Sequence, residues 1–187
     1  MRDKPQARSK PRSGSVAHIG QGEFHVVSDP RACLGTILGS CVATVIWDPT
    51  ARVGGLNHLL LPSSKVKDPD EFGHDVNLME RLINGVLQAG ADRSNLRAKM
   101  FGGAKMIDGL GAAGVINSEF VSRFLSDEAI PCDAQSVGGQ FARRLRVWPA
   151  LGRVQQLRLR DYEGEDLVHG SRRRRAAALK LSGVELL

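Results

Sequence analysis

The chain has 187 residues, of which 42% are hydrophobic, and this is enough for the core of one ordinary globular domain. Three cysteines, with no Cys-x-x-Cys pair, argue against a disulfide framework and against zinc, so we expect a cytoplasmic protein without a metal or cofactor. There is no run of 18 apolar residues, so no membrane insertion is expected.

The formal net charge of +6 is concentrated at the two ends of the chain. Basic residues are frequent among the first twelve, and Arg172 to Arg175 form a second basic block. Such blocks can attract nucleic acid, but no aromatic residue interleaves with the second one, so a platform for stacking bases is missing. We therefore expect no nucleic-acid binding, and predict a disordered basic extension (1–15), one domain (16–160) and a charged extension (161–187).

The first half of the domain has the pattern of a β-structure. Residues 16–27 alternate loosely and predict one or two short strands. A buried strand is predicted over residues 42–47, directly after the small-residue turn that ends in Cys41. A turn at Asp48 leads to a second apolar segment, residues 54–62, so the two segments are expected to form a hairpin.

The second half alternates between helices and strands. A polar surface loop over residues 62–75 precedes a helix over residues 75–89, which Gly90 is expected to cap. A second helix is predicted from about residue 118 to 129, with Ser118 as its N-cap. The remaining strand candidates are residues 96–106, 130–137, 145–148 and 154–159, the last two joined by a turn over residues 149–152.

Cys41 and His58 are the residues in this pattern that carry chemistry. A thiol beside an imidazole is the basis of cysteine nucleophilic catalysis, and the hairpin can bring the two together. The turn residues Gly39 and Ser40 can offer backbone N–H groups to an oxyanion. A histidine in an apolar strand is, however, often a hydrogen-bonded core residue, so the residues alone leave this choice open.

Other polar and sulfur-containing residues are weaker candidates. A third group should orient the imidazole, and Thr36 is a hydroxyl candidate, whereas Asn57 is expected to point to the opposite face of its strand. Cys33 and Cys132 lie in apolar strand-like segments and are expected to be buried and inert.

Paired glycines occur at two strand ends. They allow close backbone approach or positive φ, and could form ordinary turns or shape a substrate groove. With Asn57, the groove candidates are Gly102, Gly103, Gly138 and Gly139.

These motifs together resemble the chemoreceptor glutamine deamidase (CheD) family. The resemblance rests on LGSCVATVIWDP, on GGLNHLLLP with His58 seventeen positions after Cys41, on AKMFGGAKM, on Asn117, and on Gly138-Gly139 followed by Arg143. It implies a layered α/β sandwich with a mixed or antiparallel sheet core, as in deamidating bacterial toxins.

The resemblance also implies a reaction. Glutamine side chains of methyl-accepting chemotaxis receptors would be hydrolysed to glutamate and ammonia through a thioester, and some members also act on receptor methyl esters. Cys41 would be the nucleophile, His58 the base and later the acid, and Thr36 the orienting hydroxyl.

The chain departs from the family pattern at several positions. The family threonine often lies six residues before the cysteine, where this chain has Gly35, and the other departures are Ile116, Ser136 and Gln140. The departures at Ser136 and Gln140 favour one alternative, a non-catalytic adaptor that docks on receptors or on a CheC-type chemotaxis phosphatase.

Overall fold

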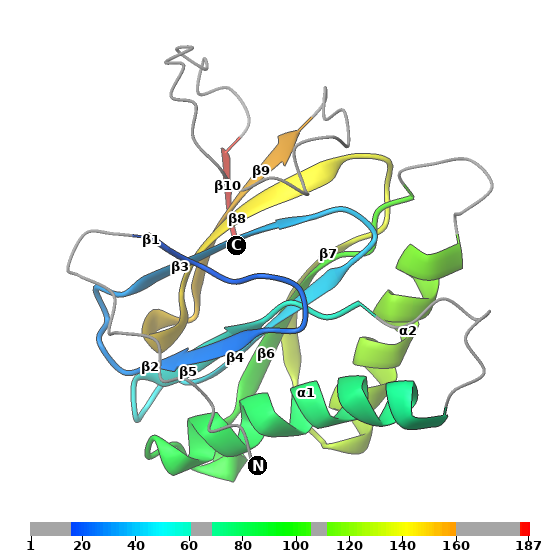
Figure 1. Ribbon diagram of the computed structural model, residues 1–187. Coiled ribbons are helices and arrows are strands. Elements are labelled where there is room, and N and C mark those ends of the chain that lie inside the picture. The colour runs from blue at the N-terminus through cyan, green and yellow to red at the C-terminus, as the bar shows by residue number, and fades with distance from the viewer. Residues whose placement is uncertain (1–15, 61–68, 106–111, 160–183) are drawn as a thin grey trace, which may run out of the picture.

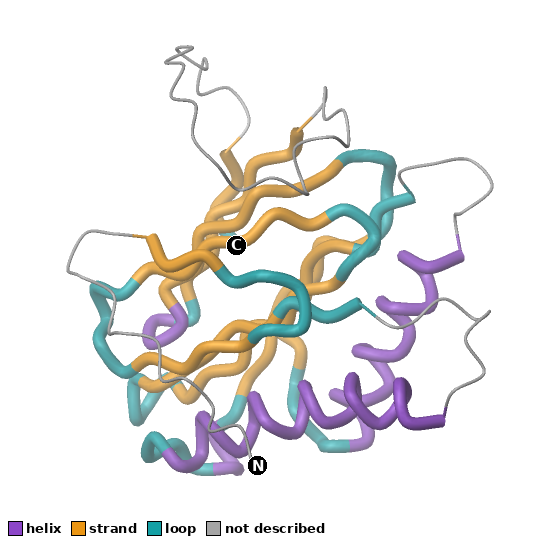
Figure 2. The backbone as a smooth tube through the Cα atoms, in the orientation of Figure 1, coloured by secondary structure: helices purple, strands orange, loops and turns teal. Residues whose placement is uncertain are grey.

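The computed structural model describes residues 16–60, 69–105, 112–159 and 184–187, and these form three layers (Figure 1). Two five-stranded sheets pack face to face, and both long helices cover one side of the pair (Figure 2). The outer sheet has the order β1 (Val16–His18), β3 (Cys33–Leu38), β8 (Ala142–Trp148), β9 (Arg153–Leu159) and β10 (Val184–Leu186). The central sheet has the order β2 (Phe24–Val27), β5 (Val53–Asn57), β4 (Val42–Asp48), β6 (Arg97–Gly102) and β7 (Cys132–Val137).

Both sheets are mixed. The β1–β3 and β6–β7 pairs are parallel and the other pairs are antiparallel. The prediction of a layered α/β sandwich with a mixed sheet core is therefore confirmed. Two 3-10 helices, η1 (Arg93–Asn95) and η2 (Pro149–Leu151), complete the described elements.

The predicted β4–β5 hairpin is the centre of the fold. The Asp48 carboxylate accepts the N–H groups of Thr50 at 2.7 Å and Ala51 at 2.9 Å, which closes the turn. Every residue of β4 is buried, because alternate side chains pack against the helices and against the outer sheet. This two-sided burial explains the nearly continuous apolar run in the sequence.

Helix α1 (Pro69–Gln88) begins earlier than expected. Its C-terminal end follows the prediction: Gly90 has φ +106°, and the N–H groups of Gly90 and Ala91 bond to the carbonyls of Leu87 and Val86, as in a Schellman motif. The prediction of a loop over residues 62–75 was wrong from residue 69 onward, where α1 begins. Pro69 is the first residue of this helix, a position to which proline is well suited. Residues 61–68 lie outside the described part of the chain.

Helix α2 (Ala112–Asp127) also begins before its predicted start. Ser118 is not an N-cap, because its hydroxyl donates to the carbonyl of Gly114 within the helix at 2.8 Å. Gly114, in the first turn of α2, lowers the helix propensity there, so the sequence did not predict this start. Because Gly114 has no side chain, the helix can lie against Gly103.

The predicted strands after α1 are confirmed as β6, β7 and the β8–β9 hairpin. Cys33 is buried as expected, whereas the expectation for Cys132 was wrong, since this residue is exposed on β7, an edge strand of the central sheet. β10 pairs with β9, so residues 184–186 belong to the outer sheet rather than to a separate extension. Residues 1–15 and 160–183, including Arg172 to Arg175, lie outside the described residues. Within the described residues, no helix has the length and apolar character needed to span a membrane.

Candidate active site

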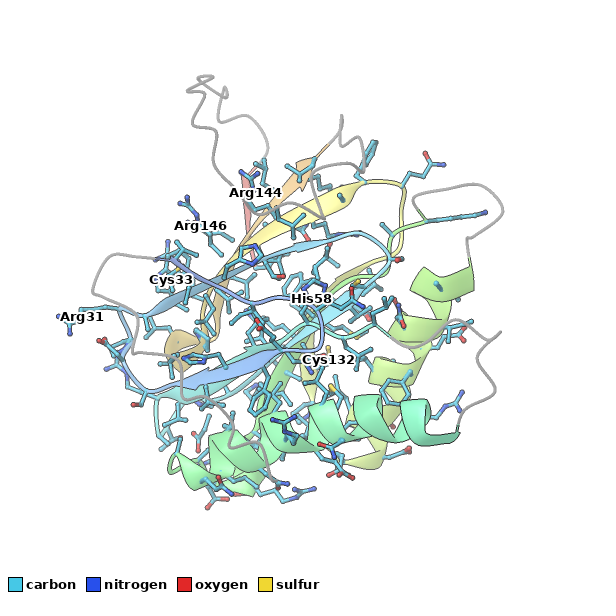
Figure 3. All side chains as sticks on the ribbon, in the orientation of Figure 1. Arg31, Cys33, His58, Cys132, Arg144 and Arg146 are labelled. Atoms are coloured by element: carbon cyan, nitrogen blue, oxygen red, sulfur yellow. The ribbon has the colours of Figure 1, made fainter. Side chains whose placement is uncertain are left out.

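His58 lies between the two sheets, directly after β5, and is only 7% exposed (Figure 3). Its Nδ1 is 2.8 Å from Oγ1 of Thr36, which comes from β3 of the outer sheet. Thr36 is itself 1% exposed. The structure therefore brings these two predicted site residues into a buried hydrogen bond that links the sheets.

The surroundings of Thr36 fix the tautomer of the imidazole. Oγ1 of Thr36 is 2.9 Å from the carbonyl oxygen of Ile19, which can only accept a hydrogen bond. The hydroxyl donates its single hydrogen there, so it must accept one from Nδ1–H of His58. Nε2 then carries the free lone pair. Nε2 is buried and has no hydrogen-bond partner among the described residues, so it is available to act as a base.

A loop over residues 19–23 holds His58 in place. The N–H of Gly22 donates to the carbonyl of His58 at 2.8 Å, and the N–H of His58 donates to the carbonyl of Glu23 at 3.0 Å. Nδ1 also lies 3.4 Å from the carbonyl oxygen of Ile19. Sequence reasoning missed this loop, because backbone carbonyls accept hydrogen bonds whatever the residue type.

Burial sets the charge of the imidazole. Loss of solvent lowers the pKa of His58 below its ordinary value, and the Ile19 carbonyl and the negative charge of Glu23 only partly offset this. His58 is therefore neutral at pH 7 and able to accept a proton.

Cys41 lies on the same side of the central sheet as His58. The neighbouring residues Val42 and Leu59 are paired by two backbone hydrogen bonds of 2.9 and 2.7 Å, and both side chains pack on the helix side. Side chains alternate along a strand, so Cys41 and His58 both face the outer sheet, where Cys41 packs against the core between the sheets. Such diagonal positions on one sheet face are about 7–8 Å apart, within reach of side-chain rotation.

The turn before Cys41 is held by three successive carbonyl groups. The Gly39 and Cys41 carbonyls accept the N–H groups of Ala104 and Gly103, each at 2.8 Å. The Ser40 carbonyl accepts Nδ2 of Asn117, a fully buried residue of α2, at 2.8 Å. In a trans peptide the N–H points opposite to the carbonyl, so the N–H groups of Ser40 and Cys41 point away from these anchors.

Gly102 and Gly103 support this turn from behind. Their φ values are +113° and +63°. A Cβ at Gly102 would lie 2.1 Å from the Cys41 carbonyl oxygen, and one at Gly103 would lie 2.1 Å from Oγ of Ser118. Glycine is therefore required by both backbone conformation and close approach.

The second glycine pair borders a cavity of about 450 Å³, which Ser136 and Gln140 also line. The N–H of Gly138 donates to the Gly102 carbonyl at 2.9 Å, and Gly139 accepts the N–H of Lys105 at 2.7 Å. These two hydrogen bonds connect one wall of the cavity to residues 102–105, the segment that contacts the turn before Cys41.

Asn57 lies on the opposite face from His58. It is fully buried, and its Oδ1 accepts the N–H of Thr44 at 2.8 Å beside Met79 of α1. The structure therefore does not bring Asn57 to the cavity or to the Cys41 turn.

The Cys41 thiol is protonated in the substrate-free protein, because burial raises its pKa to about 11. A neutral thiol and a neutral imidazole can react by transferring the proton as the sulfur attacks.

In the described part of the chain, no group of three or more His, Cys, Asp or Glu side chains is placed to hold a metal ion.

Comparison with known proteins gives a consistent result. The family model described as CheD chemotactic sensory transduction matches residues 60–158, a range that begins just after His58. A probable chemoreceptor glutamine deamidase CheD of Cereibacter sphaeroides is 49% identical over 143 residues, 76% of this chain and 72% of the relative. Similarly named proteins of Caulobacter vibrioides and Rhizobium etli are 49% and 48% identical and cover 78% and 81% of this chain, and 79% and 84% of their own.

Among solved structures, the hypothetical protein YfiH of Bacillus licheniformis matches 60% of this chain and 49% of its own, at 14% identity and a TM-score of 0.39. A TM-score of 0.39 marks a weak likeness, and the fold of this chain is defined by its own sheets and helices.

Proposed function

The chain belongs to the CheD family, and on that premise we propose that it deamidates chemoreceptor glutamines with Cys41 as its nucleophile. The observation that carries this proposal is the buried Thr36–His58 hydrogen bond, which leaves the basic Nε2 of His58 free on the sheet face that Cys41 shares. His58 is the base, and Thr36 orients it.

In the first half-reaction, Sγ of Cys41 attacks the carbonyl carbon of the glutamine side chain while Nε2 of His58 takes the thiol proton. The N–H groups of Ser40 and Cys41 donate to the oxyanion of the tetrahedral intermediate. Nε2–H then protonates the amide nitrogen, ammonia leaves, and a thioester between Cys41 and the substrate remains.

In the second half-reaction, water attacks the thioester carbonyl while Nε2 takes one of its protons. The new oxyanion uses the same donors. When it collapses, the C–S bond breaks, the sulfur regains its proton from His58, and the product is a glutamate side chain. A glutamate methyl ester would follow the same route with methanol as the first leaving group, so we extend the proposal to methylesterase activity.

Thr36 and Ile19 stabilise the imidazolium that forms in each half-reaction, since Nδ1–H faces two oxygen acceptors. Both acceptors are neutral, and a neutral group stabilises a cation less than the carboxylate of a Ser-His-Asp triad does. A modest rate fits an enzyme that modifies a limited number of protein sites.

The proposed site of action is the cytoplasm. Three free cysteines favour a reducing cytoplasm, where the receptor domains that carry the target glutamines would be accessible. We retain a CheC-type phosphatase as a second protein partner, without membrane insertion or nucleic-acid binding.

Ammonia release from a receptor cytoplasmic fragment tests the enzyme against the adaptor alternative. We expect release by the unmodified chain and by a Cys132→Ala control, and none by Cys41→Ala. Receptor binding without ammonia release by any of the three proteins would instead support the adaptor.

A further inference from the structure

Large hydrophobic side chains are exposed at five positions in the described part of the chain. They are Val16, Val115, Ile116, Phe141 and Leu151, and each is between 39% and 51% exposed. Single exposed apolar residues are ordinary on a protein surface, whereas apolar residues that gather beside a reaction centre mark an interaction surface. Val16 pairs with Cys33, at the opposite end of β3 from the Cys41 turn, so it lies away from the candidate active site.

Phe141 lies at the same end of the molecule as the Cys41 turn. It directly precedes β8, and Arg143, two residues later, pairs with Leu38, three residues before Cys41. Figure 1 shows the β3–β4 turn, the β7–β8 loop and the N-terminal end of α2 together at this end. Leu151 follows the other end of β8, a strand of seven residues that extends about 20 Å. Leu151 is therefore far from the Cys41 turn.

Ile116 lies beside the residue that anchors this turn. It directly precedes Asn117, whose Nδ2 donates to the Ser40 carbonyl at 2.8 Å. Successive residues of an α-helix are turned by about 100°, so Ile116 flanks the face of α2 that contacts the Cys41 turn. Val115 is turned by about 200° from Asn117 and faces away from that turn. Ile116 and Phe141 are therefore the exposed apolar side chains at the candidate active site.

The backbone at both residues is held in place although their side chains are exposed. The carbonyl of Phe141 accepts a hydrogen bond from the Arg143 guanidinium at 3.4 Å, and Ile116 is part of helix α2. Phe141 and Val137 also line the cavity of about 450 Å³, which leaves space beside the aromatic ring for a side chain of a ligand. A polypeptide whose glutamine reaches Cys41 must cover this end of the molecule, so it can bury both apolar side chains.

We propose that Ile116 and Phe141 form a docking surface for apolar side chains of the polypeptide that carries the target glutamine, and that both are specificity-determining residues. This inference rests on the proposed deamidase function. The substrate segment then has leucine, isoleucine, valine or methionine close to the glutamine, because burial of apolar surface on both partners stabilises the complex. Glutamine alone is too small to cover two side chains that come from different elements, so the neighbouring residues of the substrate supply the contact.

Steady-state kinetics of four glutamine variants on a receptor cytoplasmic fragment test the proposal. Ile116→Gln and Phe141→Gln should each raise KM about five- to tenfold and leave kcat unchanged, because binding that is equal in the ground state and the transition state is lost. Val115→Gln and Leu151→Gln are the matched controls, since each replaces an equally exposed apolar side chain that faces away from Cys41, and both should keep the KM of the unmodified chain. Surface substitutions cost little stability, so Tm should stay within about 2 °C in all four variants.

Peptides with a single glutamine identify the side chains that the surface accepts. Leucine, or asparagine as its polar counterpart of similar shape, is placed in turn at positions one to four before and after the target. At one or more positions, we expect leucine to tighten binding about five- to tenfold relative to asparagine, and Ile116→Gln or Phe141→Gln to remove that preference. Equal binding of both peptides at all positions, or a preference that is lost as readily in Val115→Gln and Leu151→Gln, would overturn the proposal.

Binding of the same peptides to Cys41→Ala separates this inference from the deamidase proposal. Tighter binding of leucine peptides that is lost in Cys41→Ala/Phe141→Gln supports the docking surface even if no peptide is deamidated, in which case only the proposed reaction fails. A second copy of the chain is the alternative occupant, and sedimentation velocity detects it. A dimer that is lost in Ile116→Gln/Phe141→Gln, together with equal binding of leucine and asparagine peptides, would contradict a substrate as the occupant.

Discussion

Nδ1 of His58 and Oγ1 of Thr36 lie 2.8 Å apart although they come from different sheets. The imidazole is therefore oriented by the packing of one sheet on the other, and Nδ1 is engaged while Nε2 has no hydrogen-bond partner among the described residues. We propose that the chemistry of the site depends on this contact.

Replacement of Thr36 by valine tests this dependence. Thr36→Val removes the nearer of the two acceptors of Nδ1–H and the hydroxyl that donates to the Ile19 carbonyl, so we expect kcat to fall about 10- to 100-fold, the effect of about 1.5–3 kcal/mol. Thr36→Ser should restore most of the activity. Steady-state kinetics on a receptor fragment measure both.

Thr44→Val is the matched control, because Thr44 is equally buried and its Oγ1 has no hydrogen-bond partner among the described residues. We expect full activity and a Tm about 2–4 °C higher, since a costly buried hydroxyl is replaced by a methyl group. Equal loss of kcat in both variants would show that Thr36 acts through packing alone.

Substitutions at Gly102 and Gly90 separate the effect of steric conflict from the effect of backbone strain. Both have φ above +100°, but a Cβ at Gly102 would meet the Cys41 carbonyl oxygen at 2.1 Å, whereas one at Gly90 would have nothing within 4 Å. We expect Gly90→Ala to cost about 1 kcal/mol and leave kcat unchanged. Gly102→Ala should lower stability further and reduce kcat at least tenfold. Comparable effects of the two substitutions on kcat would contradict a supporting role for Gly102.

Asn117→Asp tests the anchor of the turn. The carboxylate cannot donate to the Ser40 carbonyl and instead repels it, so the N–H of Cys41 is expected to shift. We expect at least a tenfold loss of kcat with little change in KM. Ser118→Ala, on the same helix, removes only a bond within α2 and should keep kcat. Normal kcat in Asn117→Asp would argue against the Cys41 N–H as an oxyanion donor.

Alkylation by iodoacetamide reports the protonation state of Cys41. Because burial raises the pKa of this thiol to about 11, only a small fraction is thiolate at pH 7. We expect Cys41 to react at least tenfold more slowly than free cysteine at pH 7, with a rate that rises with pH toward 11. Peptide mapping distinguishes it from Cys132. Rapid alkylation at pH 7 would indicate a preformed thiolate and contradict proton transfer during attack.

The sequence predicts the strands well, because they depend on local pattern. Alternating side chains identify β4 and β5, and the hairpin between them places Cys41 and His58 on one face. Gly90 ends α1 as expected, since the αL cap has a residue-type signature.

Features that depend on nonlocal packing were not predictable. The Ile19 carbonyl has no residue-type signal, and the exposure of Cys132 follows from the order of strands in the central sheet. The pairing of Arg143 with Arg158 depends on the β8–β9 register. The early start of α2 was not predicted, because the residues of its first turn have weak helix propensity.

The proposed reaction is tested most directly by peptide mapping, by mass spectrometry, of a chemoreceptor cytoplasmic domain incubated with the protein in ¹⁸O-labelled water. We predict conversion of defined glutamines to glutamates that carry one ¹⁸O atom, and no conversion with Cys41→Ala or His58→Ala. Undiminished conversion by Cys41→Ala would contradict the assignment of Cys41 as the nucleophile.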